Sequence, residues 1–173
     1  MRTTLALILL MAGLWACTQQ KPVEETAALP TPPIEITADT YVGPCKQALA
    51  SLSGGDIDAF VKDMTENCIY RFNNGDSIAG KAAITAYWKD RRTNVIDKIS
   101  FDNEIWLPVK VNTSEQVRPG NWVLSWYRVQ STYKTGKSMT QYIHTVYHFN
   151  DAGQLDEVIQ YLDRVPIVQA TTP

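Results

Sequence analysis

The sequence predicts one α+β domain over residues 41–165, with helices in its first part and strands in its second. Up to about position 94, apolar residues recur mostly three or four positions apart, as on one face of a helix. Beyond that point they alternate with polar residues, as in strands that bury one face, and turn-forming stretches separate these segments. Helices followed by hairpin-linked strands are the order typical of an α+β fold.

Three helices are expected before the main run of strands. The first covers residues 42–52 and ends near Gly54, because glycine is common just beyond a helix C-terminus. The second follows Asp56, whose carboxylate is suited to capping the first turn. The third covers residues 80–94, with aromatic side chains on its apolar face.

Five strands are expected. The first, residues 68–72, lies between the second and third helices and is followed by the turn sequence Asn-Asn-Gly-Asp at 73–76. The remaining four follow the third helix and cover residues 99–111, 122–132, 139–150 and 154–165.

The chain begins with an export signal, residues 1–16. Arg2 supplies a short positive region, and the apolar run at 5–14 is shorter than the about 20 residues that span a bilayer. Ala16 and Cys17 end a sequence that resembles the bacterial lipobox, although Trp15 stands where that motif usually has a small or aliphatic residue. The resemblance implies cleavage before Cys17 and lipid modification of Cys17 with acyl chains such as palmitate. A plain signal peptide and an uncleaved anchor are the alternatives.

The ends of the mature chain are expected to lie outside the domain. Residues 17–40 form a linker whose part from 21 to 40 holds four prolines, and residues 166–173 form a C-terminal tail. The expected location is the cell envelope, with the chain exported and anchored in a membrane by lipid. Thr18 stands where an aspartate would indicate retention in the inner membrane, so analogy with enteric bacteria favours the outer membrane, facing the periplasm.

The charge balance argues against nucleic acid as a partner. Of 16 basic residues, one lies in the signal, which leaves 15 against 18 acidic residues. The basic cluster of Lys89, Arg91 and Arg92 is interrupted by Asp90, so no basic stripe is present. A composition of 45% hydrophobic and 20% charged residues is that of a globular protein.

Cys45 and Cys68 are the two cysteines that remain once Cys17 carries lipid. Export to an oxidising compartment favours a disulfide between them. Two separate buried thiols, acting as small apolar residues, are the equal alternative.

Three motifs connect the domain to a known superfamily. They are residues 55–61, residues 78–84 with Tyr87 and Trp88, and residues 147–155 followed by 161–163. Their order resembles the nuclear transport factor 2-like superfamily, particularly its ketosteroid isomerase and SnoaL-like polyketide cyclase branches. The resemblance implies a cone-shaped, curved mixed or antiparallel sheet that three N-terminal helices pack over a pocket. It implies no single activity, because the superfamily contains enzymes, transport factors and non-catalytic modules.

The residues of the isomerase reaction are absent from this sequence. Ketosteroid isomerases use an aspartate base, and a tyrosine with a protonated aspartate stabilises the enolate. Alignment on the motifs places Ala48 at the tyrosine, Phe72 at the base and Thr145 at the acidic donor. Alanine and phenylalanine carry no exchangeable side-chain proton. We therefore expect neither steroid-type isomerisation nor a cofactor.

The same alignment predicts a pocket with aromatic walls and few polar groups. Such a pocket suits a flat apolar or aromatic small molecule that one or two hydrogen bonds orient. The alternative is that these aromatic side chains fill the core. The expected lining residues are Tyr70, Phe72, Tyr87, Trp88, Trp126, Arg128, Thr145, Tyr147 and Gln160.

His144 and His148 do not predict a metal site. Four positions along a strand span about 13 Å at about 3.3 Å per residue, whereas one zinc ion binds each nitrogen at about 2.1 Å. No metal is therefore expected. His144, if a bulge turns it inward, and Asp163, at the end of the last strand, are the catalytic candidates, and a capping role is the alternative for Asp163.

Three functions remain open. The sequence favours a small-molecule-binding or interaction module that lacks catalysis. The second function is a small-molecule lyase, isomerase or hydrolase of the SnoaL-like type that uses a different polar set. The third is a homodimer that pairs through the outer face of the sheet, where Trp106, His144 and His148 are expected.

Overall fold

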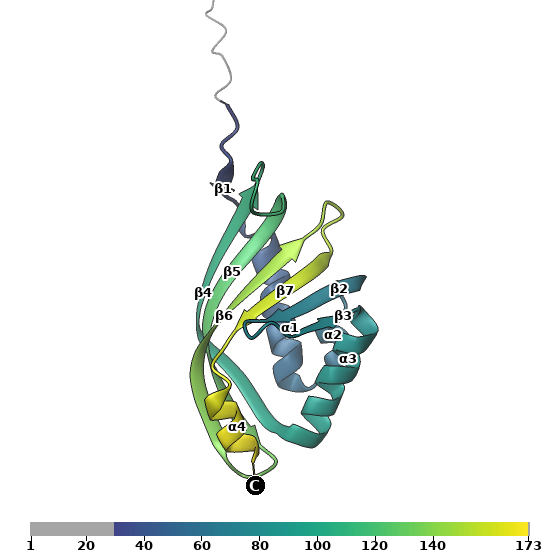
Figure 1. Ribbon diagram of the computed structural model, residues 1–173, viewed down its shortest axis with the longest axis vertical. Coiled ribbons are helices and arrows are strands. Elements are labelled where there is room, and N and C mark those ends of the chain that lie inside the picture. The colour runs from purple at the N-terminus through teal and green to yellow at the C-terminus, as the bar shows by residue number, and fades with distance from the viewer. Residues whose placement is uncertain (1–29, 173) are drawn as a thin grey trace, which may run out of the picture. The chain divides into compact units, whose positions relative to one another are not determined.

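A curved sheet of seven strands is the framework of the protein in the computed structural model, which describes residues 30–172 (Figure 1). In chain order the strands are β1 (Ile34–Ile36), β2 (Met64–Phe72), β3 (Ser77–Ala79), β4 (Ile96–Val111), β5 (Gly120–Tyr133), β6 (Ser138–Phe149) and β7 (Leu155–Tyr161). They lie side by side in the order β1, β4, β5, β6, β7, β2, β3, and only the pair of β2 and β7 is parallel. The α+β class and the curved mixed sheet are confirmed.

Helices cover the concave face of this sheet (Figure 1). The three helices predicted before the main strands are present, and a fourth follows the last strand. The helical segments are η1 (Asp39–Tyr41), a 3-10 turn, α1 (Val42–Gly54), α2 (Ile57–Phe60), α3 (Lys81–Asp90), η2 (Arg91–Val95), a π-helical turn, and α4 (Val165–Thr171).

Local chemistry explains where α1 ends and α2 begins. Gly55 adopts a left-handed conformation with φ of 82°, and its N–H donates to the carbonyl of Leu52 at 3.2 Å. The capping glycine is thus one residue later than the predicted Gly54. Asp56 caps α2 as predicted, because its carboxylate accepts a hydrogen bond from the N–H of Ala59 at 2.9 Å.

Two segments outside the predicted domain are part of the fold. The strand β1, which lies in the predicted linker, pairs with the end of β4, and Ile34 stands opposite Val111. The side chain of Asn112 secures this strand by donating to the carbonyl of Pro32 at 2.9 Å. Helix α4 lies in the predicted tail, and it begins where the carboxylate of Asp163 accepts from the N–H of Val165 at 2.8 Å.

A bulge in β4 reverses the predicted orientation of Trp106. Asp102 pairs with Arg128 and Ile105 with Trp126, so β4 holds one residue more than β5 over this stretch. Such a bulge changes which alternate residues face inward. Trp106 therefore stacks on the core ring of Tyr127, with centroids 6.1 Å apart, instead of lying on the outer face. The predicted homodimer face does not include it.

The core lies between the concave face of the sheet and the helices. Cys68 from β2, Ile84 from α3 and Val123 from β5 have no exposed side-chain surface, and Tyr127 is 1% exposed. Residues 31–173 form a compact unit of their own. No helix within residues 30–172 has the length and apolar character that crossing a membrane requires.

Cys45 and Cys68 are separate free thiols, which is the second of the two readings that the sequence left open. Both side chains are buried, at 3% and 0% exposure, so they act as small apolar core residues. Burial raises the pKa of the Cys68 thiol to about 12 and also raises the pKa of Cys45, because a thiolate is poorly solvated in the core.

Both core thiols are therefore expected to be inert in the folded protein. Near pH 8, a thiol-specific reagent should label neither Cys45 nor Cys68 until guanidinium chloride unfolds the chain, after which both should react. Intact mass with and without reductant provides the second readout. A gain of two hydrogens on reduction would contradict the free thiols.

Candidate ligand-binding pocket

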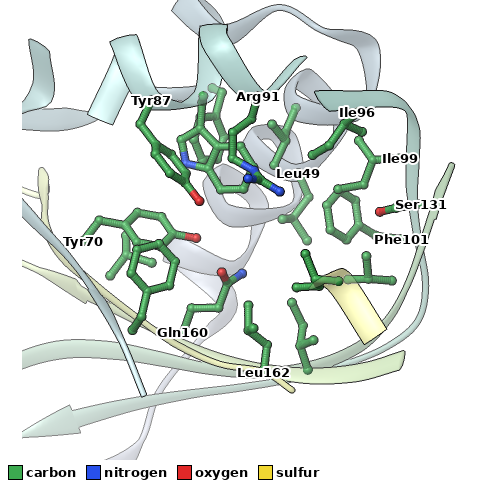
Figure 2. A pocket seen from close by; sticks show the side chains of 18 of the residues that line it. Leu49, Tyr70, Tyr87, Arg91, Ile96, Ile99, Phe101, Ser131, Gln160 and Leu162 are labelled. Carbon is green, nitrogen blue, oxygen red and sulfur yellow. The ribbon is translucent and has the colours of Figure 1, made fainter. Parts of the chain in front are cut away.

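A cavity of about 290 Å³ lies between the helices and the concave face of the sheet (Figure 2). This volume is at the lower end of small-molecule sites, about 300–1,000 Å³. Its walls are mainly apolar side chains from the four α-helices and from the strands β2 and β4 to β7. Apolar examples are Leu49, Ile99, Phe101, Val158, Leu162 and Ile167.

Six of the nine predicted lining residues surround this cavity. They are Tyr70, Phe72, Tyr87, Trp88, Tyr147 and Gln160. Thr145 also faces inward, but Tyr127 covers it: the two hydroxyl groups are 2.8 Å apart and Thr145 is 1% exposed. Thr145 therefore holds a wall residue in place and does not reach the cavity.

Trp126 and Arg128 lie on the outer face of the sheet, which corrects their predicted place in the wall. Successive residues of a strand point to opposite faces, and Tyr127 between them points inward. Arg128 forms an ion pair with Asp102 at 2.7 Å. Trp126 stacks on His144, with ring centroids 4.6 Å apart. Neither side chain reaches the cavity.

The predicted catalytic candidates also lie outside the cavity. His144 is on the outer face, where its Nδ1 donates to the carbonyl of Ser125 at 2.8 Å. The carboxylate of Asp163 accepts a hydrogen bond from the first N–H of α4, so it has the structural role at the strand end that the sequence left open. His148 is buried beside Asp156 and Pro119, with each ring nitrogen facing an oxygen atom.

Arg91 is the lining residue of most chemical interest that the sequence did not identify. It is the first residue of η2, it is half-buried, and its guanidinium group points into the cavity in Figure 2. Its guanidinium carbon lies 5.7 Å from the ring centre of Tyr87. Within residues 30–172, no carboxylate forms an ion pair with it. In the sequence it is one of three clustered basic residues, with no sign that it turns inward.

Gln160 and Tyr70 present further polar groups to the cavity. Their side chains are 7% and 3% exposed, and in Figure 2 the amide and the hydroxyl group both point toward the open space. The Gln160 amide lies close enough to the Tyr127 hydroxyl group to lower its pKa, so Gln160 has one partner in the wall. Buried polar groups are normally paired, and the Tyr70 hydroxyl group and the remaining amide atoms of Gln160 can pair with a ligand or with water.

The lining contains no group suited to accept a proton near neutral pH. None of its described residues is Asp, Glu, His or Cys. Ala48 and Phe72, the aligned isomerase positions, both face the cavity. Burial raises the pKa of Tyr70 and of Tyr147 well above 10.0, so both hydroxyl groups stay protonated. The described residues also contain no cluster of three or more His, Cys, Asp or Glu side chains placed to hold a metal ion.

Comparisons with known proteins agree on the fold and differ in activity. A family model described as a SnoaL-like domain matches residues 46–158. A candidate polyketide cyclase from Xanthomonas campestris is 16% identical, with a TM-score of 0.60 over 76% of this chain and 96% of that chain. An LEH-like epoxide hydrolase from M. tuberculosis is 12% identical, with a TM-score of 0.57 over 75% and 87%.

A third solved structure is a hypothetical protein from Catenulispora acidiphila with a ketosteroid isomerase-like fold, in complex with trimethylamine. It is 11% identical, with a TM-score of 0.56 over 75% of this chain and 97% of that chain. A comparison with curated proteins gives no match. At these identities the structural similarity shows the fold alone.

The buried tyrosines make a prediction about alkaline stability. Above the unfolded tyrosine pKa of 10.0, the unfolded chain releases protons that the folded chain keeps on Tyr70 and Tyr147. Their contribution is fully present below pH 10 and is lost as the pH rises, by up to about 1.4 kcal/mol per pH unit for each group.

Denaturant titrations at several values from about pH 9 to 11.5 measure this loss. In Tyr147→Phe, the free energy of unfolding should fall less steeply with pH than in the wild type. Equal slopes in the two proteins would contradict the assignment.

Proposed function

The chain belongs to the SnoaL-like domain family of the nuclear transport factor 2-like superfamily, and from this premise we propose that it binds a small apolar or aromatic molecule without converting it. One observation carries the proposal. The cavity has apolar walls and unpaired polar groups, which suit binding, and its described lining lacks an acid or base for catalysis.

The lack of a base matters because reactions such as that of the ketosteroid isomerases begin with a proton transfer to a base. A general base must ionise near the working pH and lie within hydrogen-bond distance of the substrate. The tyrosine hydroxyl groups stay protonated, and the guanidinium group of Arg91 offers only N–H donors, so these groups donate hydrogen bonds and are unsuited to act as a base. These groups orient a bound molecule.

An enzyme of lyase, isomerase or hydrolase type is the second candidate. The polar set of Tyr70, Arg91 and Gln160 favours it, because hydrogen-bond donors that converge on one cavity also stabilise a developing negative charge. Of the polar residues that the sequence placed in the lining, Arg128 and Thr145 do not reach the cavity, whereas Arg91, which was not predicted, does. Chemical change of a bound compound, lost in Arg91→Met, would favour the enzyme over the binding module.

Filling the cavity should abolish binding while the fold persists. Ala48 faces the cavity from α1, and Ala50 is on the exposed side of the same helix. In a thermal-shift screen of small naphthalene derivatives, a ligand at about ten times its Kd should stabilise the wild type by about 1.4 kcal/mol, which raises Tm by several degrees.

Ala48→Phe should lose this shift, and the matched control Ala50→Phe should keep it. Circular dichroism establishes that both variants are folded. A shift that survives in Ala48→Phe would place binding elsewhere, and the absence of any shift in the wild type would contradict a ligand pocket of this kind.

We further propose that a lipid attached to Cys17 anchors the domain in the cell envelope. This residue and the export signal lie outside the residues that the structure describes, so the sequence carries the proposal. More than one acyl chain is enough for stable anchoring. The outer membrane, facing the periplasm, is the proposed location.

Labelling with radioactive palmitate in bacterial cells tests the anchor. The wild-type chain should take up label and sediment with membranes. The Cys17→Ala variant should take up no label. Once its export signal is cleaved, it should no longer sediment with membranes. A wild-type protein that is exported but never labelled would indicate a plain signal peptide.

A further inference from the structure

We infer that the ligand of this pocket is an amphipathic organic acid whose single carboxylate binds Arg91 while its apolar body fills the cavity. The inference rests on the proposed binding function and narrows it to one chemical class. It comes from the unequal environments of two neighbouring arginines and from the lack of acidic groups around the cavity.

Arg92 uses both terminal nitrogens of its guanidinium group inside the protein, while its buried Nε has no hydrogen-bond partner among the described residues. Its guanidinium group donates to the carbonyl oxygens of Ile96 at 3.2 Å and Asp97 at 3.3 Å, at the start of β4. It also donates to the carbonyl of Ser53 at 3.4 Å, near the end of α1. Arg92 therefore fixes the turn η2 against two other elements.

Arg91 has no such partners although it is the adjacent residue. Within residues 30–172 it makes no ion pair, and its guanidinium group points into the cavity (Figure 2). The π-helical turn that holds both arginines is a rare conformation that often occurs at functional sites. The rigid turn set by Arg92 thus holds Arg91 at the cavity with its hydrogen-bond donors free.

No acidic side chain of the described lining neutralises Arg91. The second cation of the lining, Arg164, already bonds to Asp76 at 3.2 Å and lies 5.2 Å from the ring centre of Phe72. The cavity therefore has a positive potential at Arg91. A cationic ligand is disfavoured and an anionic one is attracted.

A neutral apolar ligand would leave the polar groups of the cavity without hydrogen-bond partners on the ligand. It would displace water from Arg91, Gln160 and Tyr70 without giving them acceptors, and an unpaired buried donor costs about tenfold in affinity. A carboxylate compensates the largest of these losses, because its two oxygen atoms match the two parallel N–H groups of a guanidinium. Gln160 and Tyr70 remain for a second polar group on the ligand body.

A matched pair of probes tests the inference. Naphthalene-2-carboxylate and naphthalene-2-carboxamide have nearly the same shape, and only the first is charged at pH 7. Isothermal titration on the chain from Thr18 onward, which contains the whole compact unit, should give the acid at least about tenfold higher affinity than the amide. Decanoate and decanamide repeat the comparison for an aliphatic body.

Variants locate the preference. Arg91→Met should lower the affinity for the acid to that for the amide, and it should leave the affinity for the amide unchanged within about threefold. Arg91→Lys should keep part of the preference for the acid over the amide, because lysine retains the positive charge but lacks the two parallel N–H groups of the guanidinium. Lys89→Met removes an exposed charge, paired with Asp58 at 2.8 Å, and should keep the wild-type preference.

The outcomes separate the inference from the proposed function. Equal affinities for acid and amide in the wild type, or an acid preference that survives in Arg91→Met, overturn the carboxylate assignment and leave a binding pocket. Binding of neither pair of probes counts against the binding function, and the inference fails with it. If Arg91→Met does not fold, Arg91→Lys decides: an acid preference as large as that of the wild type and of Lys89→Met would overturn the assignment to Arg91.

Discussion

The strict alternation of side chains along a long, curved antiparallel ladder is the constraint on which this protein depends. Strands β4, β5 and β6 pair over most of their length, so each residue faces either the cavity or the outside. The hydroxyl contact between Tyr127 and Thr145 joins β5 to β6 on the inner face. On the outer face, Trp126 and His144 stack across the same two strands. The same two strands therefore provide both the inner face that lines the cavity and the aromatic outer face of the sheet.

The sequence was sufficient for the class of fold and for most helices and strands, because those follow from local periodicity and capping. Asp56 and the alternation in β6 are examples of signals that act over a few residues. It was insufficient where a long-range contact decides the structure. The pairing of β1 with β4 has no local signal, and one extra residue near Asn103 turned Trp106 inward.

The aromatic walls of the pocket could be predicted from the sequence, but its charged lining residue Arg91 could not. Aromatic residues near the family motifs gave Tyr70, Phe72 and Tyr87, because motif alignment fixes their strand or helix face. Arg91 escaped prediction since a π-helical turn places it, and helical periodicity does not anticipate such a turn. A described lining without carboxylates and with an inward-pointing arginine supports the proposed recognition of charge over proton transfer.

The short strand β1 has a consequence for how far the domain reaches from a membrane. A free linker over residues 17–40 would extend at most about 85 Å, at about 3.6 Å per residue. Because β1 begins at Ile34 and Asn112 already binds the carbonyl of Pro32, no more than residues 17–31 separate Cys17 from the fold, and they extend at most about 55 Å. A lipid at Cys17 would therefore confine the pocket to a thinner layer of the periplasm, and ligands delivered at the membrane surface would meet it at a higher local concentration.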